Sequence, residues 1–381
     1  MNTLHLCTSD SWGGLELYAC TLMEELQKSG VNVLAVCKPN SKVQEYLSSR
    51  GIESKLLPSY KKISFASVRE MRKCIDERGI EVVHAHFHRD VWLASLMLRN
   101  DKKRKLFVSI YMGVPEKTDP LHRWLFQRVQ GIFSSSKALN ERLPKLYPVP
   151  AQKIHYMPYG RKISEYRIDL SKRTQVRSQY GVKDDETVIG TMLRIDEGKG
   201  VRDFVESYQY LEEASKTSVR FLIVGEPTRR GVKPVSGSPF EQRSEAYRDQ
   251  LVQYVHDRGL QDRIIFIGYQ SDTIGYLSAM DIFVFPSRDE MYSLVVLDAM
   301  CLGLPVVAAR SGGNLYQVAE GESGLMYNTA DSADLARKLA EYLKNPAMRD
   351  QHTKAARAFV EHEHDMKAVI ERLKSFYSTI V

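Results

Sequence analysis

The chain has 381 residues, 43% of them hydrophobic and 27% charged, as is ordinary for a soluble globular protein. Its length predicts two domains, and the sequence has no apolar run of the roughly 18 residues that a membrane-spanning helix needs. The net charge of +7 comes from residues 1–160, which hold 24 Lys and Arg against 15 Asp and Glu, a balance of +9, while the rest holds 30 against 32, a balance of −2.

The N-terminus and the cysteines indicate a cellular compartment. Residues 1–7 have no basic stretch before their apolar run, so they predict a buried strand and not a signal peptide. The five cysteines are scattered without a CxxC pair, which disfavours a structural zinc or disulfide framework. We therefore expect a cytoplasmic protein in a reducing environment.

The basic excess is densest at Lys102–Lys105. One interpretation is a solvated basic face. The other is a surface that meets anionic lipid head groups or an anionic acceptor, which would place the protein peripherally at the inner face of the cytoplasmic membrane. Nucleic acid is disfavoured as a partner, because no recognisable nucleic-acid-binding motif accompanies the charge.

Strand and helix patterns alternate along the first 160 residues. The chain opens with a predicted strand at Leu4–Cys7, a turn at Gly13-Gly14, a helix at Leu15–Gln27 and a strand at Val31–Cys37. This unit is typical of the start of a doubly wound α/β domain. Further parallel strands are predicted at Val82–His86, Leu106–Ile110 and Gly131–Ser134, with a helix from about Lys137.

The pattern restarts near residue 187. Strands are predicted at Thr187–Met192, Arg220–Val224, Ile264–Ile267, Asp281–Phe285 and Leu304–Ala308, with a helix at Asp203–Leu211. Strands that alternate with helices imply parallel sheets. Two segments depart from this alternation. Glu226–Glu245 is rich in Pro, Gly, Ser and Arg and predicts a long flexible loop. Ala355–Tyr377 predicts a charged helix.

Two glycine turns and a basic loop have the residues that anion binding needs. Gly13 and Gly14 stand before a predicted helix, where free N–H groups favour a phosphate; a tight turn is the alternative. Arg194 and Lys199 lie five residues apart on a glycine-containing loop and could converge on one diphosphate; a solvated basic loop is the alternative. Ser311-Gly312-Gly313-Asn314 is a second glycine turn.

An acidic segment follows the strand at Asp281–Phe285. Glu290 and Asp298 are eight residues apart and could reach different parts of one ligand, with the predicted helix start near Ser293-Leu294 offering N–H groups to a phosphate. An acid suits ribose hydroxyls, as in dinucleotide-binding folds. The alternative is an N-cap acid followed by an acid on the helix face.

Histidines alternate at His84, His86 and His88, at a predicted strand end. Alternate residues of a strand share one face, so a metal site is geometrically possible, but no acidic or cysteine cluster supports it and we expect no metal. A role in lining a cleft on the acceptor side is the stronger functional interpretation for His86 and His88, beside ordinary packing. His122, at a predicted helix start, could face the cleft or cap the helix.

Together these motifs resemble retaining glycosyltransferase family 4, of the bacterial lipopolysaccharide and cell-surface glycan type, over nearly the whole chain. The resemblance implies the GT-B fold: two Rossmann-like domains facing across a cleft, with a C-terminal helix crossing back. Residues 1–160 would form the acceptor-side domain, residues 161–355 the nucleotide-sugar domain, and residues 356–381 the helix that packs on the first domain.

The resemblance also implies roles for single residues. Arg194 and Lys199 would hold the diphosphate, and Glu290 the donor sugar hydroxyls. The family's second acid is a glutamate that contacts the ribose, a role carried to the shorter Asp298. Further donor contacts would come from Gly13, Gly14, Tyr292, Ser293 and Leu294.

The chain departs from the family pattern in Val108-Ser109-Ile110-Tyr111-Met112-Gly113-Val114, where the family often has a histidine beside the reacting sugar. We expect Tyr111 rather than Met112 to take this place as a catalytic residue, since a tyrosine hydroxyl can still hydrogen-bond a sugar or phosphate.

The expected function is metal-independent, retaining transfer of a sugar from a nucleoside diphosphate, UDP favoured over GDP, to a glycan or lipid-linked acceptor. No DxD-type carboxylate pair stands at a suitable strand end, so we expect no cofactor, and Arg194 and Lys199 would stabilise the leaving diphosphate. A sugar-nucleotide epimerase, and a nucleotide-sugar-binding protein without catalysis, are the alternatives. A dinucleotide oxidoreductase is disfavoured, because no GxGxxG follows the first strand.

Overall fold

The computed structural model describes residues 1–57, 65–113, 116–214, 218–230, 238–288 and 290–379. The chain divides into two compact units, each with its own parallel sheet. Unit 1 comprises Met1–Gly160 and His364–Val381, and unit 2 comprises Arg161–Glu363. The chain therefore returns to unit 1 at His364, where residue 356 was expected.

The sheet of unit 1 has seven parallel strands in the order β3-β2-β1-β4-β5-β6-β7. Their apolar residues are almost all buried, as expected for strands covered on both faces. The strands are β1 Asn2–Leu6, β2 Asn32–Cys37, β3 Ser54–Leu56, β4 Val82–Ala85, β5 Lys105–Ile110, β6 Val129–Ser134 and β7 Ile154–Tyr156.

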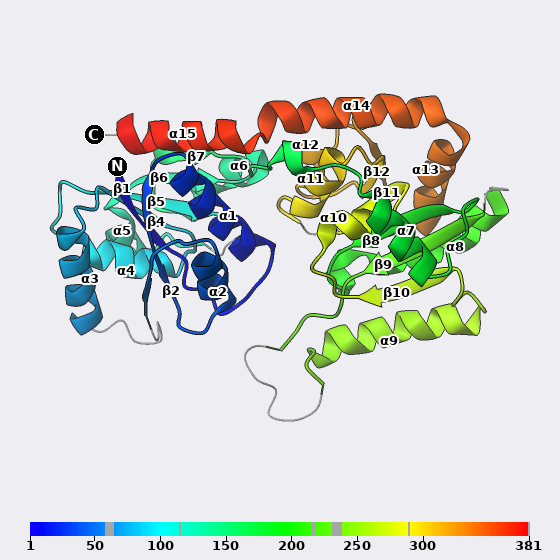
Figure 1. Cartoon of the computed structure of the whole chain (residues 1–381), viewed down its shortest axis with the longest axis horizontal. Coiled ribbons are helices and arrows are strands. Elements are labelled where there is room, and N and C mark those ends of the chain that lie inside the picture. The colour runs from blue at the N-terminus through cyan, green and yellow to red at the C-terminus, as the bar shows by residue number, and fades with distance from the viewer. Residues whose placement is uncertain (58–64, 114–115, 215–217, 231–237, 289, 380–381) are drawn as a thin grey trace. The chain divides into compact units, whose positions relative to one another are not determined.

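Helices cover this sheet, and one of them comes from the far end of the chain. The helices are α1 Gly14–Lys28, α2 Lys42–Ser49, α3 Phe65–Glu77, α4 Asp90–Met97, α5 Pro120–Phe126, α6 Lys137–Leu146 and α15 Met366–Thr379, with a 3-10 turn at Ala151–Lys153. The α15 helix, red in Figure 1, packs on α1. At its start His364 Nδ1 hydrogen-bonds the carbonyl of Tyr159 at 2.7 Å, and Met366 lies against Gly160, where a Cβ atom would come within 2.7 Å of the Met366 sulfur.

The sheet of unit 2 has six parallel strands in the order β10-β9-β8-β11-β12-β13. They are β8 Thr187–Met192, β9 Val219–Val224, β10 Ile264–Gly268, β11 Ile282–Phe285, β12 Val306–Ala309 and β13 Leu325–Tyr327. The helices are α7 Leu170–Gln179, α8 Val201–Ala214, α9 Gln242–Asp257, α10 Thr273–Ser278, α11 Leu294–Cys301, α12 Asn314–Gln317, α13 Ser332–Lys344 and α14 Pro346–Glu363, with 3-10 turns at Ile163–Glu165 and Glu197–Lys199.

The prediction of two parallel-sheet Rossmann-like domains is confirmed. Two local predictions are wrong. The expected loop Glu226–Glu245 ends early, because α9 begins at Gln242 and Arg229 forms an antiparallel bridge with Phe240; its residues 231–237 lie outside the described part of the chain. The expected single helix near the C-terminus is two helices, α14 and α15. In the described ranges, no helix combines the length and apolarity that crossing a bilayer demands.

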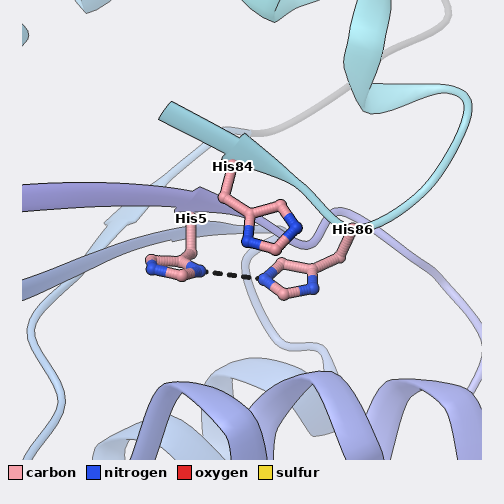
Figure 2. Close-up of side chains that lie close together, drawn as sticks. All are labelled: His5, His84 and His86. Atoms are coloured by element: carbon pink, nitrogen blue, oxygen red, sulfur yellow. Dashed lines mark hydrogen bonds between the residues drawn. The ribbon is translucent and has the colours of Figure 1, made fainter. Parts of the chain in front are cut away.

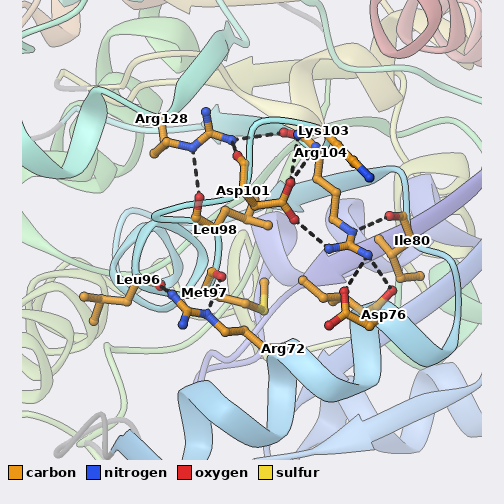
Figure 3. Close-up of polar contacts among 11 residues, drawn as sticks. Arg72, Asp76, Ile80, Leu96, Met97, Leu98, Asp101, Lys103, Arg104 and Arg128 are labelled. Atoms are coloured by element: carbon orange, nitrogen blue, oxygen red, sulfur yellow. Dashed lines mark hydrogen bonds and ion pairs between the residues drawn. The ribbon is translucent and has the colours of Figure 1, made fainter.

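Much of the basic excess of unit 1 has structural partners (Figure 3). Arg104 pairs with Asp101 at 2.6 Å and with Asp76 at 2.8 Å. Arg72 and Arg128 instead donate to carbonyls at the C-terminus of α4, where unpaired carbonyls and the helix dipole favour a cation. These carbonyls belong to Leu96, Met97 and Leu98, at 2.9–3.0 Å.

The densest basic run is therefore not a uniform surface. Besides Arg104, Lys105 is engaged, since its ammonium group donates to the carbonyl of Tyr377 in α15 at 2.8 Å. Only Lys102 and Lys103 of the four are exposed.

Candidate functional site

In unit 2, the candidate donor segment runs from Pro286 to Asp298 and joins β11 to α11. The second glycine turn fixes one side of it. The Gly313 N–H donates to the Glu290 carbonyl at 2.7 Å, and a Cβ atom on Gly313 would lie 1.9 Å from the carbonyl oxygen of Met291. Gly312 has φ +52°, in the left-handed region that favours glycine. The glycine pair is thus required for close backbone packing.

A side-chain amide anchors the start of α11. Gln317 accepts from the Ser293 N–H at 2.7 Å and donates to the Ser293 carbonyl at 2.8 Å. The expectation that Ser293 offers a free N–H to a phosphate is therefore wrong for this residue, because that donor is used internally. Tyr292 is buried beside it, and Leu294 is the first residue of α11.

The basic loop fixes the other side of the donor segment. Gly200 has φ +66°, and a Cβ atom there would lie 2.1 Å from the Pro286 carbonyl oxygen. The Arg288 N–H donates to the Gly198 carbonyl at 3.0 Å. Between these contacts Lys199 reaches Glu290, with 2.5 Å between Nζ and Oε2. A cation and a carboxylate from two distant segments therefore meet just before α11.

Arg194 has a different hydrogen-bond partner from this pair. Its side chain is exposed and donates to the Thr228 hydroxyl at 3.2 Å. It lines a separate open pocket of about 470 Å³, together with Asp196, Thr228 and Arg243, and Lys199 is not among the described residues that line it. Arg194 and Lys199 thus have different partners in the structure, and their convergence on one diphosphate stays a prediction.

Asp298 has partners of its own. Its Oδ1 lies 2.7 Å from Nε of Arg161 and accepts a hydrogen bond from the Tyr166 hydroxyl at 2.6 Å. The side chains of Arg161 and Asp298 are only 11% and 13% exposed, so little solvent screens the pair. Burial and the adjacent Asp298 raise the pKa of Tyr166, so this hydroxyl stays a donor. The carboxylate expected to meet a ribose is here bound to the first residues of unit 2.

In unit 1, the Gly13-Gly14 pair is exposed and stands where α1 begins. Leu15, the next residue, lines a pocket of about 420 Å³ at the carboxyl ends of β1, β4 and β5. In open α/β sheets this edge is where ligands bind. Its lining includes Thr8, His86, His88, Asp90, Trp92 and Tyr111.

The histidine cluster differs from the expected alternation (Figure 2). The β4 strand ends at Ala85, so His88 leaves the strand and does not share the face of His84 and His86. Instead His5, paired with His84 across β1 and β4, completes a buried group of three. Its ring nitrogens lie close enough together to hold a metal ion.

Hydrogen bonds nonetheless account for every ring nitrogen of these three histidines. His5 bonds His86 at 2.9 Å and Thr3 at 3.2 Å, while His84 bonds Ser109 at 2.8 Å and the Tyr377 hydroxyl at 2.5 Å. The remaining nitrogen, Nδ1 of His86, lies 2.8 Å from the Tyr111 hydroxyl. Burial lowers the pKa of His5 to about 3 and those of the other two well below the usual value, so all are neutral at pH 7.

The hydrogen bonds that link Tyr111, His86, His5 and Thr3 have one consistent order of donors and acceptors. The Thr3 hydroxyl donates to the Asn32 carbonyl at 3.2 Å, so it must accept from His5 Nε2. A neutral His5 then accepts at Nδ1 from His86, and His86 in turn accepts at its own Nδ1 from Tyr111. The Tyr111 hydroxyl, whose pKa burial raises, is therefore a donor committed to His86 inside unit 1.

The other two acceptor-side candidates are neighbours. The rings of His88 and His122 lie 5.6 Å apart between centroids. Nδ1 of His122 is 2.5 Å from a carboxylate oxygen of Asp119, which caps α5. Nδ1 of His88 is buried without a hydrogen-bond partner among the described residues, and burial lowers the His88 pKa to about 4.

Sequence reasoning did not single out Asp90, the first residue of α4. Its side chain is fully buried, and burial raises its pKa to about 6. Its position directly after a strand end at the ligand-binding edge was the available signal. Arg161 and Gln317 were also missed, because only the fold brings them to Asp298 and Ser293.

Comparison with protein families assigns both units. Residues 12–165 match the description "Glycosyltransferase Family 4", and residues 172–359 match "Glycosyl transferases group 1". The chain belongs to the family 4 glycosyltransferases. The family expected from the motifs is thus confirmed.

Two curated relatives illustrate the range of glycosyltransferases that this chain resembles. The alpha-D-kanosaminyltransferase of Streptomyces kanamyceticus is 22% identical over 271 residues, 69% of this chain and 65% of the relative. The lipopolysaccharide core biosynthesis glycosyltransferase LpsE of Rhizobium meliloti is 35% identical over 102 residues, 27% of this chain and 30% of the relative. The chain spans between 49% and 65% of the first four curated relatives it matches.

A solved structure supports the fold of this glycosyltransferase over its whole length. Anabaena HepE in complex with UDP has a TM-score of 0.82 at 20% identity, with 100% of both chains covered. A glycosyltransferase from Rickettsia africae has a TM-score of 0.86 at 16% identity, covering 100% of this chain and 98% of its own.

Proposed function

We propose that the protein transfers a sugar from a uridine diphosphate sugar to an acceptor hydroxyl, with the donor on unit 2 and the acceptor on unit 1. Family membership supports the reaction class. The crystallised complex of HepE with UDP supports uridine as the base. For unit 2 the pocket at Arg194 and the segment at Glu290 lie on the carboxyl side of the sheet, where this fold class binds nucleotides.

The ion pair of Lys199 and Glu290 carries the proposal. A buried or half-buried cation held beside the N-terminus of a helix is suited to a diphosphate, whose charge grows as the glycosidic bond breaks. Glu290 holds Lys199 in place through the ion pair and accepts from the sugar hydroxyls of a bound donor. Arg194, on its exposed loop, adds a second cation once its hydrogen bond with Thr228 is exchanged for a phosphate oxygen.

The two cations Lys199 and Arg194 also allow a metal-independent reaction. Lys199 and Arg194 supply positive charge to the leaving diphosphate, the task that a divalent ion performs in other enzymes of this kind. The resemblance to retaining enzymes supports retention of anomeric configuration, and the likeness to the LpsE segment supports an acceptor in surface-glycan synthesis.

A thermal-shift titration with UDP and GDP tests donor binding, because a ligand that binds the folded state raises its Tm. UDP should stabilise the wild type more than GDP does, and Lys199→Ala should lose most of the UDP shift. Lys183→Ala removes an exposed lysine of the same unit and should keep it. Equal UDP shifts in both variants would remove Lys199 from the donor site.

Product analysis tests the reaction. NMR of the product formed from a UDP-sugar and an added glycan should show the anomeric configuration of the donor. Conversion of the donor sugar without an acceptor would instead indicate an epimerase.

A binding protein with altered catalysis is the second candidate, and the engagement of Asp298 by Arg161 and Tyr166 favours it. It predicts UDP-sugar binding without turnover against a broad acceptor panel. Restoring the family's glutamate by Asp298→Glu would then change UDP affinity but create no transfer.

A further inference from the structure

Asp90 stands out in unit 1 as a buried acid with one oxygen unused. It is the first residue of α4 and lines the 420 Å³ pocket at the carboxyl ends of β1, β4 and β5. Its Oδ1 accepts from the Thr8 hydroxyl, whereas Oδ2 has no hydrogen-bond partner among the described residues. A carboxylate oxygen left without a donor in a buried site is costly, so its place in the lining of a pocket calls for a partner that enters the pocket.

The pocket surrounds this acid with apolar and neutral groups. Trp92, Phe87 and Ile110 line it, and flat aromatic and aliphatic surfaces suit the C–H faces of a ring. His88, which also lines it, has a buried Nδ1 with no partner among the described residues and is uncharged at neutral pH. Tyr111 adds its ring but not its proton, which is committed to His86.

The charge of the pocket selects against anions. The pKa of Asp90 is about 6, so the side chain is ionised at pH 7.5 and repels a phosphate or carboxylate strongly where solvent does not screen it. The one cationic side chain among the described lining residues is Arg89, which is exposed and therefore screened.

We propose that this pocket binds the acceptor as a neutral, hydroxyl-bearing ring, a sugar or cyclic polyol, with one ligand hydroxyl donating to Oδ2 of Asp90. The neighbouring His88 Nδ1 exchanges a second hydrogen bond with an adjacent hydroxyl. The inference rests on the proposed function, because it names the class of acceptor for unit 1.

Binding without a donor tests the pocket separately from transfer. Saturation-transfer NMR on the full chain at pH 7.5 would use methyl α-glucoside, methyl α-galactoside, methyl α-mannoside and myo-inositol as neutral probes, and glucose 6-phosphate and glucuronic acid as anionic ones. At least one neutral probe should bind, and neither anionic probe should displace it.

Three variants identify the group responsible. Asp90→Asn keeps the shape of the side chain and an acceptor for the Thr8 hydroxyl but removes the charge. It should lower the affinity for the neutral probe about tenfold to a hundredfold, the usual effect of losing a charge-assisted hydrogen bond. Asp90→Ala should weaken it at least as much. Asp76→Asn, a surface change on α3 of the same unit, should have no effect.

Deoxy analogues of the bound probe give a readout that a loss of stability cannot mimic. The wild type should discriminate against one mono-deoxy analogue, and Asp90→Asn should lose that discrimination, because the hydroxyl and the carboxylate interact directly. Unchanged discrimination, stronger binding of an anionic probe, or no binding of any neutral probe would overturn the inference. Failure of the proposed function would appear separately, as an absence of UDP-sugar consumption with the same acceptors.

Discussion

The guanidinium of Arg161 lies 2.7 Å from the carboxylate of Asp298, and the Tyr166 hydroxyl completes the contact at 2.6 Å. This group ties the first turn of unit 2 to α11. The family's glutamate at the second acidic position would be one methylene longer than Asp298, so the shorter acid suits this internal contact.

The first prediction concerns the stability that this pair provides. Asp298→Ala should lower the free energy of unfolding by about 1–3 kcal/mol, because it leaves a nearly buried arginine without its carboxylate. Urea unfolding measures it. The control Glu371→Ala breaks an exposed pair with Lys374 and should cost under about 0.5 kcal/mol. A loss of UDP affinity with unchanged stability would return Asp298 to a ribose-binding role.

The second prediction uses Gly313, which packs against the donor segment. Gly313→Ala places a Cβ atom against the Met291 carbonyl, so the backbone at Glu290 must move, and UDP affinity should fall at least about tenfold. Lys183→Ala, at an exposed position of the same unit, is the control and should bind UDP normally. Isothermal titration calorimetry distinguishes the two, and normal UDP binding by Gly313→Ala would show that this backbone packing is dispensable.

The third prediction is instability in mild acid. His5, His84, His86 and His88 have pKa values lowered by burial, so below about pH 6.5 the unfolded chain binds protons that the folded chain does not. The stability that depends on these neutral histidines is present above pH 6.5 and is lost as the pH falls, by up to about 1.4 kcal/mol per pH unit for each group.

Asp90 acts in the opposite sense. Its folded-state pKa is raised, so its contribution is present at low pH and is lost as the pH rises through about 6. The contribution of Asp90 offsets that of one histidine, so acidification still causes a net loss of stability. The Tm should fall steeply between pH 7.5 and 5. The fall should be less steep in His88→Gln and as steep as in the wild type in His362→Gln, because the His362 side chain is 84% exposed. A Tm that is constant over this range would contradict the neutral network.

The fourth prediction isolates the contact between α15 and the histidines. Tyr377→Phe removes the hydroxyl 2.5 Å from His84 Nδ1 and leaves that nitrogen buried without its hydrogen-bond partner, at a cost of about 1–3 kcal/mol. Tyr269→Phe, at a position 56% exposed, is the control and should be neutral. Equal midpoints of urea unfolding for the two variants would mean that His84 Nδ1 finds another hydrogen-bond partner.

The fifth prediction tests contact with a membrane surface. If the basic face of unit 1 meets anionic lipid, Lys102→Gln with Lys103→Gln should weaken binding to phosphatidylserine vesicles about tenfold or more, since each lysine near such a surface contributes about 1 kcal/mol. Lys183→Gln with Lys354→Gln makes the same charge change on exposed lysines of unit 2. Vesicle binding that is absent, or insensitive to salt, would exclude the surface as a lipid contact.

The sequence predicted the central strands well and the edges poorly. Thr187–Met192 matches β8 because its apolar residues are continuous and bounded by turns. The sequence did not predict three short edge strands, because three residues are too few to establish a period. They are Ser54–Leu56, Ile154–Tyr156 and Leu325–Tyr327. Such short strands gain their pairing from the sheet beside them.

Spacing along the chain did not predict the candidate site. The resemblance to the family assigned Lys199 and Glu290 to one ligand, and the fold brings them to 2.5 Å. Spacing instead paired Arg194 with Lys199 and Glu290 with Asp298, whereas Arg194 bonds Thr228 and Asp298 bonds Arg161. Nothing in the sequence indicated that His5 would replace His88 beside His84, because that depends on β1 and β4 being neighbours in the sheet. The partners of Asp298 and Tyr111 were hidden for the same reason.

The return of α15 to unit 1 affects how the chain can fold during synthesis. Residues 364–381 leave the ribosome after the whole of unit 2, so His84 and Lys105 lack their partner Tyr377 until then. Domains otherwise tend to fold in order of synthesis. Here the sheet of unit 1 cannot gain the cover of α15 until the residues of unit 2 have been made, although most of unit 1 is synthesised first.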